Sequence, residues 1–315
     1  MKVLRHFENI PSELKGAVVV LGNFDGVHRG HQRVIWDARQ IAQDTNVPLI
    51  VMTFEPHPRD YFGLEEAPFR LTPFRNKAHQ LEALEIDGLI VLSFDDHLSS
   101  MSAEEFIEEV LVKGVAASHV VVGYDFCFGK ARRGNPDLMR EFGEFSVTAI
   151  NPVTSPDQEI YSSSRIRNYL KSGKPGHAAA VMGRPFEVEA RIEAGAQMGR
   201  TIGFPTANVE LGDYLRPLYG VYAVRAGFER DGQMQWFDAI ANMGKRPTVD
   251  GLTELLEVHL FEFSDDIYGH YLRVAFIEFI RPEQKFDGLD KLKAQIEEDC
   301  LIVKQILHTR AAGAS

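Results

Sequence analysis

The pattern of apolar residues changes in character near residue 183. Before that point, short apolar runs typical of buried strands alternate with segments whose apolar residues recur at helical spacing. Strands that alternate with helices require crossover connections, so the sequence predicts an α/β domain with a mostly parallel sheet covered on both faces. The predicted strands are residues 17–21, 49–54, 89–94, 119–122 and 146–150, and the predicted helices include residues 34–42, residues 75–84 and a segment after a capping box of Ser102 and Glu105.

The second part of the chain is rich in short β-type runs instead. Residues 230–232 (RDG) form a hairpin turn signal, and no long helical pattern appears before residues 289–307. Several antiparallel strands and one terminal helix predict a small closed barrel. The predicted strands are residues 186–192, 221–228, 235–241, 255–263 and 271–280.

A glycine- and proline-containing segment separates the two patterns. Residues 171–183 include Gly173, Pro175 and Gly176, which favour a linker. The total length of 315 residues fits about two domains. The sequence therefore predicts one domain over residues 1–182 and a second over residues 183–315.

Composition excludes several classes of protein. The 34 Lys and Arg residues against 45 Asp and Glu residues give a net charge of −11, which disfavours a nucleic-acid-binding protein. The two cysteines cannot form a disulfide framework and favour a reducing compartment. No apolar run approaches the roughly 18 residues of a membrane helix, and the first 16 residues lack a secretory apolar core. We therefore expect a cytoplasmic location with no membrane or nucleic-acid partner, and the oligomeric state stays open.

The first predicted strand runs directly into residues 22–31 (GNFDGVHRGH). A strand, a glycine turn and a helix present backbone amides to phosphates in α/β proteins. His28 and His31 share one face of the first helical turn and can donate hydrogen bonds to a phosphoryl group in transfer. Gly30 between them lets a phosphate approach the backbone. A zinc site, or no site at all, is also compatible with two histidines at this spacing.

A second anion-binding pattern closes the first domain. Residues 161–167 (YSSSRIR) place hydroxyl groups at the start of a helix and an arginine one turn later. The same residues could form an ordinary N-cap followed by solvated arginines.

The second domain opens with a glycine-rich stretch, residues 195–208 (GAQMGRTIGFPTAN). Its glycines recur every four residues, as in a flap over phosphates, but the ending of a P-loop is missing. Thr206 and Asn208 are two residues apart, so they point to the same side of an extended segment. Their oxygens suit Mg²⁺ together with phosphate. A turn with two satisfied polar residues is the alternative.

A further candidate lies on an alternating strand of the second domain. Glu257 and His259 share one face of residues 256–260 (LEVHL), opposite Val258 and Leu260. A carboxylate in such surroundings can act as a general base. A pair of residues on the solvent side of an antiparallel sheet is the plainer interpretation.

The motifs of the first domain resemble a known superfamily. The sequence HRGH at residues 28–31 resembles the HxGH motif of the nucleotidylyltransferases, and SSSRIR at 162–167 resembles their SS[TS]xxR motif. Residues 22–31, 53–58 (TFEPHP) and 122–129 (VGYDFCFG) are similar to the FMN adenylyltransferase module of the bacterial bifunctional riboflavin kinase/FAD synthetase family.

This resemblance implies that the 5′-phosphate of FMN attacks the α-phosphorus of ATP and releases pyrophosphate. His28 and His31 would then be catalytic and hold the α/β phosphates, whereas Ser164 and Arg167 would hold the β/γ side. Asn135 stands where the family often has an acidic residue. The implied ATP-binding residues are Gly22, Phe24, His28, His31, Ser164 and Arg167, and the implied flavin-binding residues are Phe54, Phe62, Asp125, Phe126 and Phe128.

The second domain resembles the riboflavin kinase domain of the same family. The matching segments are residues 203–208 (GFPTAN), 220–223 (GVYA), 241–244 (ANMG), 246–248 (RPT), 256–260 and 281–286 (RPEQKF). The resemblance implies that Thr206 and Asn208 bind Mg²⁺ and that Glu257 takes the proton of the ribityl 5′-hydroxyl. Ala190 and Ala194 depart from the family pattern. Gly195, Gly199, Thr206 and Asn208 would bind ATP, and Arg281 and Phe286 would help cover the flavin.

The resemblance as a whole implies a bifunctional enzyme. Riboflavin and ATP would give FMN at the barrel, and FMN and ATP would give FAD at the α/β domain, with Mg²⁺ needed for both steps. Two other hypotheses are an enzyme with one working half and a flavin-binding regulator without turnover. The retained residues His28, His31 and Glu257 favour two working sites.

Overall fold

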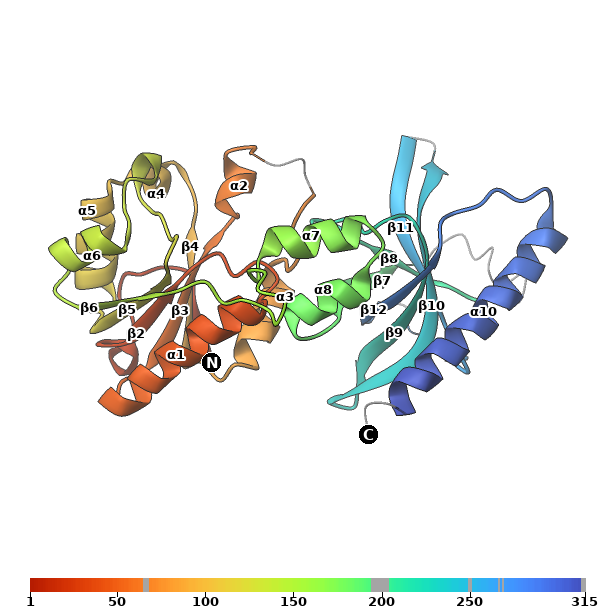
Figure 1. Ribbon diagram of the computed structural model, residues 1–315, viewed down its shortest axis with the longest axis horizontal. Helices are drawn as coiled ribbons and strands as arrows, with labels where there is room; N and C mark the ends of the chain where they lie inside the picture. Colours follow the sequence, from red (N-terminus) through yellow and green to blue (C-terminus); the bar gives the residue numbers. More distant parts are fainter. Residues whose placement is uncertain (65–67, 194–203, 249–250, 266, 268, 313–315) are drawn as a thin grey trace. The chain divides into compact units, whose positions relative to one another are not determined.

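The computed structural model describes residues 1–64, 68–193, 204–248, 251–265, 267 and 269–312. The chain packs into two compact units (Figure 1). The first comprises Met1–Ala67 and Thr72–Ser163, and the second comprises Pro68–Leu71 and Ser164–Ser315. Each unit is described by itself below.

The first unit contains a six-stranded sheet in the order β1-β4-β3-β2-β5-β6, and every neighbouring pair is parallel. The five predicted strands are confirmed. The additional edge strand is short and largely exposed, so it has no apolar run that could reveal it. The strands are β1 (Lys2–Leu4), β2 (Val18–Leu21), β3 (Leu49–Glu55), β4 (Gly88–Ser93), β5 (His119–Gly123) and β6 (Ser146–Ile150).

Helices cover both faces of this sheet, as predicted (Figure 1). Alternate residues of β2 show the two cores: Val18 and Val20 pack with α1 and α3, whereas Val19 and Leu21 pack with the helices after β4. The helical elements of this unit are η1 (Ser12–Leu14), α1 (Arg29–Thr45), α2 (Pro58–Tyr61), α3 (Phe74–Glu82), α4 (Asp96–Ser100), α5 (Ala103–Glu105), η2 (Phe106–Gly114), η3 (Lys130–Arg132) and α6 (Pro136–Phe142).

The predicted capping box begins α5. The Ser102 hydroxyl accepts from the Glu105 N–H at 3.0 Å, and the Glu105 carboxylate accepts from the Ser102 N–H at 2.7 Å. The following segment, η2, is a π-helix. Its wider turn is a local variation that apolar spacing does not distinguish from an α-helix.

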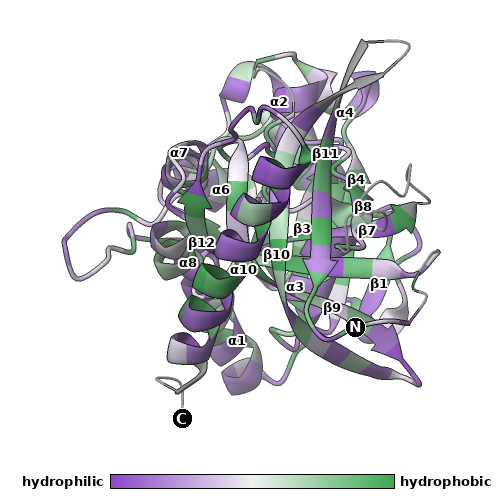
Figure 2. Ribbon diagram, turned by 90° about the vertical axis from the view of Figure 1, so that its right-hand side faces the viewer, coloured by the Kyte–Doolittle hydropathy of each residue, from purple (hydrophilic) through white to green (hydrophobic). Residues whose placement is uncertain are grey.

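The second unit contains a closed barrel in the order β10-β11-β8-β7-β12-β9, with every pair antiparallel. The predicted barrel is therefore confirmed. Asp231 and Gly232 adopt positive φ angles of 52° and 75°, as the predicted hairpin turn requires. Figure 2 shows polar and apolar residues alternating along β11. The strands are β7 (Phe186–Glu193), β8 (Ala207–Glu210), β9 (Gly220–Arg230), β10 (Gln233–Thr248), β11 (Gly251–Leu260) and β12 (Tyr271–Arg281).

The terminal helix α10 (Leu289–Ala312) covers part of the outer face of the barrel. Its Val303 and Leu307 are buried against Val221 and Ile240 of β9 and β10. Within the residues that the structure describes, neither this helix nor another combines the length and apolar character needed to cross a membrane.

The predicted linker at residues 171–183 is wrong, because most of it forms helix α8 (Pro175–Met182) after α7 (Ser163–Lys171). Pro175 occupies the first turn of α8, and Gly183 ends the helix at φ 80°. These are the usual boundary positions of a helix, so the same residues that favoured a linker serve as its start and stop signals. The boundary between residues 182 and 183 stays a prediction.

Candidate active sites

The loop after β2 leaves the sheet where the strand order reverses. Strand β2 pairs with β3 on one side and with β5 on the other, and the chain continues outward from it in both directions. Ligands of open α/β sheets bind at such a switch point, beyond the carboxyl ends of the strands. Gly22 and the two motif histidines follow β2 directly, so they lie at this position.

The two histidines are in direct contact. The His28 and His31 rings are stacked, with centroids 3.6 Å apart and planes at 18°. His28 is the N-cap of α1, and its Nδ1 accepts a hydrogen bond of 3.3 Å from the His31 N–H. Since that nitrogen acts as the acceptor, Nε2 carries the ring proton of neutral His28 and can donate it to a ligand oxygen. Phe24 packs edge-on against His31, with a centroid distance of 5.3 Å.

Gly30 is required by the histidine stack. A Cβ added there would lie 3.0 Å from Cε1 of His28 and 3.4 Å from Cβ of Tyr161. The glycine therefore lets the helix start close to both rings. Gly22 has a comparable role, because a Cβ there would meet the Phe24 ring at 3.0 Å.

Two residues outside the sequence predictions anchor this loop. Asp25 is buried, and its Oδ1 accepts from the Thr72 N–H at 3.0 Å, while the Thr72 Oγ1 accepts from the Gly26 N–H at 2.8 Å. The carbonyl of Asp25 also accepts from the Ser163 hydroxyl at 2.8 Å. Asp25 stands inside the glycine motif and could have been noticed there, whereas the sequence around Thr72 gives no signal of this contact.

Ser164 and Arg167 belong to the second unit. Ser164 is exposed on α7, whereas Arg167 is buried. The Arg167 Nε donates to the Phe69 carbonyl at 3.0 Å, and its guanidinium lies 5.0 Å from the centre of the Phe69 ring. Their predicted role toward the phosphates of ATP stays a prediction.

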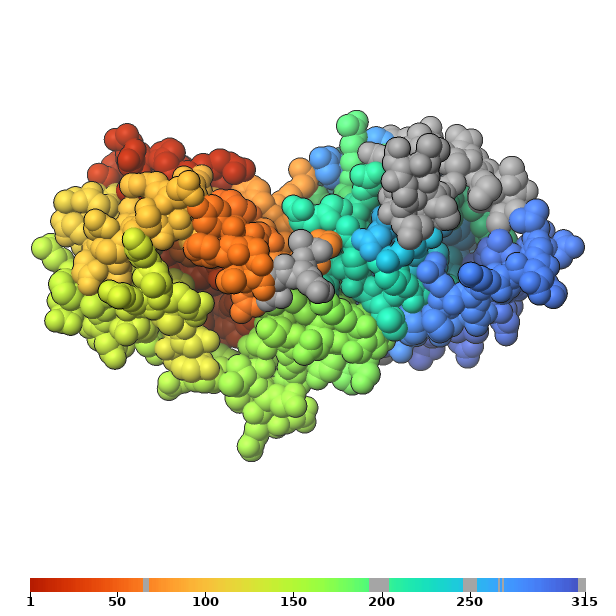
Figure 3. Space-filling view, turned by 90° about the horizontal axis from the view of Figure 1, so that it is seen from above, coloured from red at the N-terminus to blue at the C-terminus, as the bar shows by residue number. Residues whose placement is uncertain are grey.

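The phenylalanines predicted for flavin binding form two groups in the first unit. Phe54 and Phe62 both pack edge-on against Phe94, with centroids 5.9 and 5.7 Å apart. Phe126 and Phe128 are stacked at 6.0 Å. Figure 3 shows a hollow in this unit between the orange atoms that follow β3 and the yellow atoms of later segments, with dark red atoms of the N-terminal segment at its floor.

The exposure of these residues differs. Phe62 is 54% exposed, whereas Phe54 and Phe128 are buried. Asp125 is exposed in the turn after β5. Phe94, which joins Phe54 to Phe62, was not predicted, because a phenylalanine at a strand end reads as core.

Asn135 is the N-cap of α6. Its side-chain oxygen accepts from the Leu138 N–H at 2.9 Å. Asparagine and aspartate are equally good at this position. The departure from the acidic residue expected there therefore preserves a helix start.

Strand register assembles the candidate kinase site in the barrel. Glu257 on β11 lies directly opposite Asn208 on β8 and Asn242 on β10. Partners in an antiparallel pair point to the same side, so these three residues form a row across three strands. Thr206, which is half-buried, precedes β8. Asn242 was not predicted as a site residue, because only the register reveals its position.

Asn208 has an unusual environment for a polar side chain. The residue is 8% exposed, and its Oδ1 has no hydrogen-bond partner among the residues that the structure describes. Buried polar atoms normally have one, so this oxygen is suited to an additional ligand. His259 lies nearby on the same strand face as Glu257, and its Nδ1 is 2.8 Å from the Pro205 carbonyl. Gly195 and Gly199, like Ala194, lie outside the described residues.

The segment predicted to cover the flavin begins with a buried ion pair. The Arg281 guanidinium contacts both carboxylate oxygens of Asp299 on α10, at 2.7 to 3.0 Å. Asp299 is 2% exposed, and Gln295 donates to it as well. The Phe286 ring lies 5.7 Å from the guanidinium carbon of Arg281. The ion pair therefore attaches the end of β12 to the terminal helix.

A second charged cluster in the barrel unit involves Glu254. Its carboxylate accepts hydrogen bonds from the Tyr219 hydroxyl and from the Arg216 Nε, the latter at 2.7 Å. The hydrogen bond from Tyr219, with a further contribution from Arg216, lowers the pKa of Glu254. Burial is the main reason that the pKa of Tyr219 is raised to about 12.

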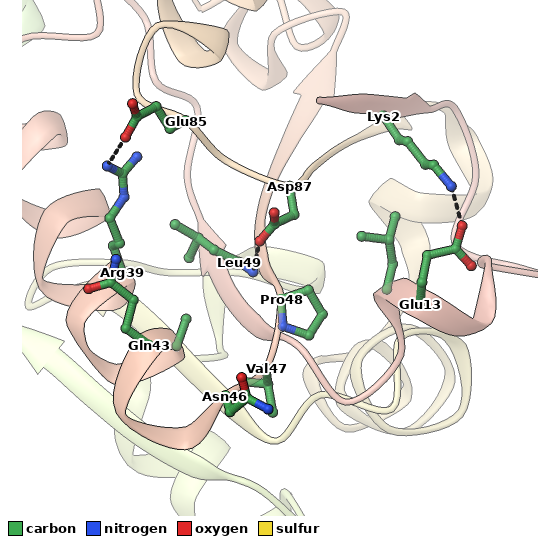
Figure 4. A pocket seen from close by; sticks show the side chains of 12 residues that line it. Lys2, Glu13, Arg39, Gln43, Asn46, Val47, Pro48, Leu49, Glu85 and Asp87 are labelled. Carbon is green, nitrogen blue, oxygen red and sulfur yellow. Dashed lines mark hydrogen bonds and ion pairs between the residues drawn. The ribbon is translucent and has the colours of Figure 1, made fainter.

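A cavity of about 670 Å³ lies at the other edge of the first sheet (Figure 4). It is lined by the start of β3, the end of α1 and the segment before β4. Two ion pairs, Lys2 with Glu13 and Arg39 with Glu85, border it, and Asp87 accepts from the Leu49 N–H. Its charged groups are therefore satisfied within the protein, and no predicted site residue lines it.

The metal-binding potential of histidine, cysteine and carboxylate residues is small. Across the described parts of the chain, no group of three such residues is placed to hold a metal ion. A metal in either unit would therefore need other ligands, such as amide, hydroxyl or phosphate oxygens.

Two family models match the chain. One described as FAD synthetase matches residues 10–165, and one described as riboflavin kinase matches residues 182–307. Both matches agree with the resemblance noted in the sequence.

Several similar proteins carry the name bifunctional riboflavin kinase/FMN adenylyltransferase. The one from Haemophilus influenzae is 40% identical, covering 98% of this chain and 100% of the relative. The protein of Escherichia coli K12 is 37% identical and covers 97% of each chain, and that of Bacillus subtilis is 38% identical and covers 92% of each.

The fold also has a solved counterpart. A crystal structure of a protein named macrolide-efflux protein, from Streptococcus pneumoniae, matches with a TM-score of 0.84 and 31% identity, covering 96% of this chain and 98% of that one. Efflux is the name of that protein alone, and the likeness here concerns the fold.

Proposed function

The chain belongs to the bifunctional riboflavin kinase/FMN adenylyltransferase family, and from this membership we propose which residues carry its two reactions. The enzyme phosphorylates riboflavin with ATP to give FMN and ADP. It then transfers the adenylyl group of a second ATP to FMN, which gives FAD and pyrophosphate. We assign the second reaction to the α/β unit and the first to the barrel.

In the α/β unit, adenylyl transfer takes place beside His28 and His31. The nucleophile is the FMN phosphate, which is already an anion, so the step needs orientation and charge stabilisation more than a base. The stacked imidazoles and the N–H groups of the first turn of α1 meet at one point, where a helix N-terminus favours negative charge. The His28 Nε2 proton is available to an oxygen of the α- or β-phosphate. Ser164 and Arg167 keep their motif-based role as predictions.

The flavin of FMN is assigned to the aromatic groups of the same unit. Phe62 offers an exposed ring, and Phe54 supports it through Phe94. Phe126 and Phe128 form the other group, beside Asp125 in the turn after β5. A planar apolar ring system gains most by stacking on such exposed aromatic faces.

In the barrel, Glu257 is the proposed general base. It would accept the proton of the ribityl 5′-hydroxyl as that oxygen attacks the γ-phosphorus of ATP, and ADP would leave. The carboxylate stands between two amide side chains, Asn208 and Asn242, which can orient it and the phosphates. Arg281 and Phe286 are assigned to the flavin, with Gly195 and Gly199 assigned to ATP.

The residues near Glu257 fit Mg²⁺. The buried Oδ1 of Asn208 and the hydroxyl of Thr206 are hard oxygen ligands, and a magnesium ion takes its remaining ligands from water and phosphate. When bound, such an ion neutralises charge on the phosphates of ATP. Asn208 and Thr206 are therefore the residues that would hold it.

The observation that carries the barrel assignment is the row of Asn208, Glu257 and Asn242. The test is chromatography of the products formed from riboflavin, ATP and magnesium chloride. We expect FMN first and FAD later, and chelation of the metal should stop both. FMN alone would support an enzyme with one working half, and neither product would support a flavin-binding regulator.

Two variants separate the two sites. Glu257→Ala should stop FMN formation while supplied FMN is still converted to FAD. His31→Ala should stop FAD formation while FMN accumulates. Glu210→Ala, which removes an exposed carboxylate of β8, is the control for Glu257. Loss of both reactions in either folded variant would contradict the assignment of separate sites.

We also propose that the enzyme works in the cytoplasm. Its Cys127 and Cys300 are both free thiols, which suits a reducing compartment.

A further inference from the structure

The loop that carries the histidines contains a strained backbone. Phe24 and Val27 adopt φ angles of 49° and 39°, and Gly26 between them adopts 85°. A β-branched residue such as Val27 rarely adopts a positive φ. A conformation of this kind persists only when the surrounding structure holds it in place.

Thr72 supplies two of the contacts that hold this loop. Its N–H donates to Oδ1 of Asp25, and its Oγ1 accepts from the N–H of Gly26, at 3.0 and 2.8 Å. Thr72 is 1% exposed and Asp25 is 2% exposed, so water does not compete for these bonds. The two bonds run in opposite directions to adjacent loop residues, and together they fix the turn.

We propose that Thr72 is a positioning residue for adenylyl transfer, whose hydroxyl sets the turn that aims His28 and His31 at the phosphates. This inference rests on the proposed function of the α/β unit. His28 follows Gly26 by two residues and is itself the N-cap of α1. On the other side of the turn, the Gln32 amide donates to the Val27 carbonyl at 2.8 Å. The turn is therefore held from both sides, by Thr72 before the histidines and by α1 after them.

The informative substitution is Thr72→Val. Valine has nearly the same shape and keeps the backbone bond to Asp25, but it removes the acceptor of the Gly26 N–H. Small displacements of positioning groups cost much in rate, so kcat for FAD formation should fall roughly tenfold to hundredfold. The KM for ATP should change less, because the ligand contacts themselves remain.

Controls separate positioning from a general loss of stability. Thr72→Ser keeps the hydroxyl and should retain FAD formation. Thr148→Val removes another hydroxyl of the same unit, one that is 2.8 Å from Nε2 of His119, and should leave kcat unchanged. Riboflavin phosphorylation by the same molecules is an internal control and should be equal in all variants.

The inference is wrong if Thr72→Val lowers kcat no more than Thr148→Val does, if Thr72→Ser is as slow as Thr72→Val, or if phosphorylation falls in parallel. His31→Ala in the same assay distinguishes this failure from failure of the site itself. If His31→Ala retains FAD formation, the proposed function of the α/β unit is wrong. If His31→Ala loses it and Thr72→Val does not, only the role of Thr72 is wrong.

Discussion

The two units build their candidate sites in different ways. In the α/β unit, the paired imidazoles, the glycine and the helix start come from one continuous stretch of ten residues, residues 22–31. In the barrel, Asn208, Asn242 and Glu257 come from three strands and meet only through register. A site of the first kind depends on local conformation. A site of the second kind depends on how strands far apart in the sequence are held together.

The largest expected effect tests the long-range dependence of the barrel. Asp299→Asn removes one partner of a buried ion pair and leaves the Arg281 charge without its carboxylate. Because Arg281 is 15% exposed, we expect a loss of about 3 kcal/mol in the free energy of unfolding of the barrel unit, the lower end for such pairs. Calorimetry of the full chain measures it.

The matched control is Asp265→Asn, which breaks the exposed pair with Arg230 and should cost less than about 1 kcal/mol. Equal destabilisation by both variants would show that the attachment of β12 to α10 contributes little to the barrel.

The next effect tests the local character of the α/β site. Gly30→Ala places a methyl group against the His28 ring and should separate the two imidazoles. We expect about a hundredfold lower rate of FAD formation, measured with supplied FMN, and unchanged phosphorylation of riboflavin. Gly176→Ala in α8 is the control, since the nearest atom to its added Cβ is 3.8 Å away. A normal rate in Gly30→Ala would exclude the histidine stack from the reaction.

A smaller effect is expected at the start of α6. Asn135→Ala removes an N-cap and should lower the stability of the α/β unit by about 1 kcal/mol, whereas Asn135→Asp should be nearly neutral. Chemical denaturation of both variants measures the difference. A stability loss in Asn135→Asp as large as in Asn135→Ala would mean that the cap is not the reason for the residue.

The smallest effect concerns the response of the barrel to acid. The pKa of Glu254 is lowered below its ordinary value of 4.5, so its ionised form stabilises the folded state. This contribution is complete above about pH 4.5 and is lost as the pH falls through the lower folded value. The difference in melting temperature between the wild type and Glu254→Gln should therefore be widest near neutral pH and close in acid. A difference that stays constant down to pH 3 would contradict this linkage.

The contrast between local and long-range construction also explains what the sequence could predict. The strands of the α/β sheet, the capping box of Ser102 and the stop signals of the hairpin are local, and the structure confirms them. Helix α8 was missed because a proline at a helix start and a glycine at its end are also the signals of a linker.

The site residues follow the same division. His28 and His31 are adjacent in the structure because they are adjacent in the sequence. Asn242 and Thr72 could not be predicted, because the first needs the register of β10 with β11 and the second needs a contact across 46 residues. Long-range pairing of this kind leaves no periodic trace along a single chain.

The membership of residues 68–71 in the second unit limits how the polypeptide can be divided. The Arg70 carbonyl accepts from the Leu215 N–H at 2.7 Å, and the Phe69 carbonyl accepts from Arg167. A gene fragment encoding only the C-terminal portion would remove both acceptors from a buried region. Dissecting the two halves for separate expression therefore calls for supplying this tetrapeptide in trans or grafting it onto the shortened product.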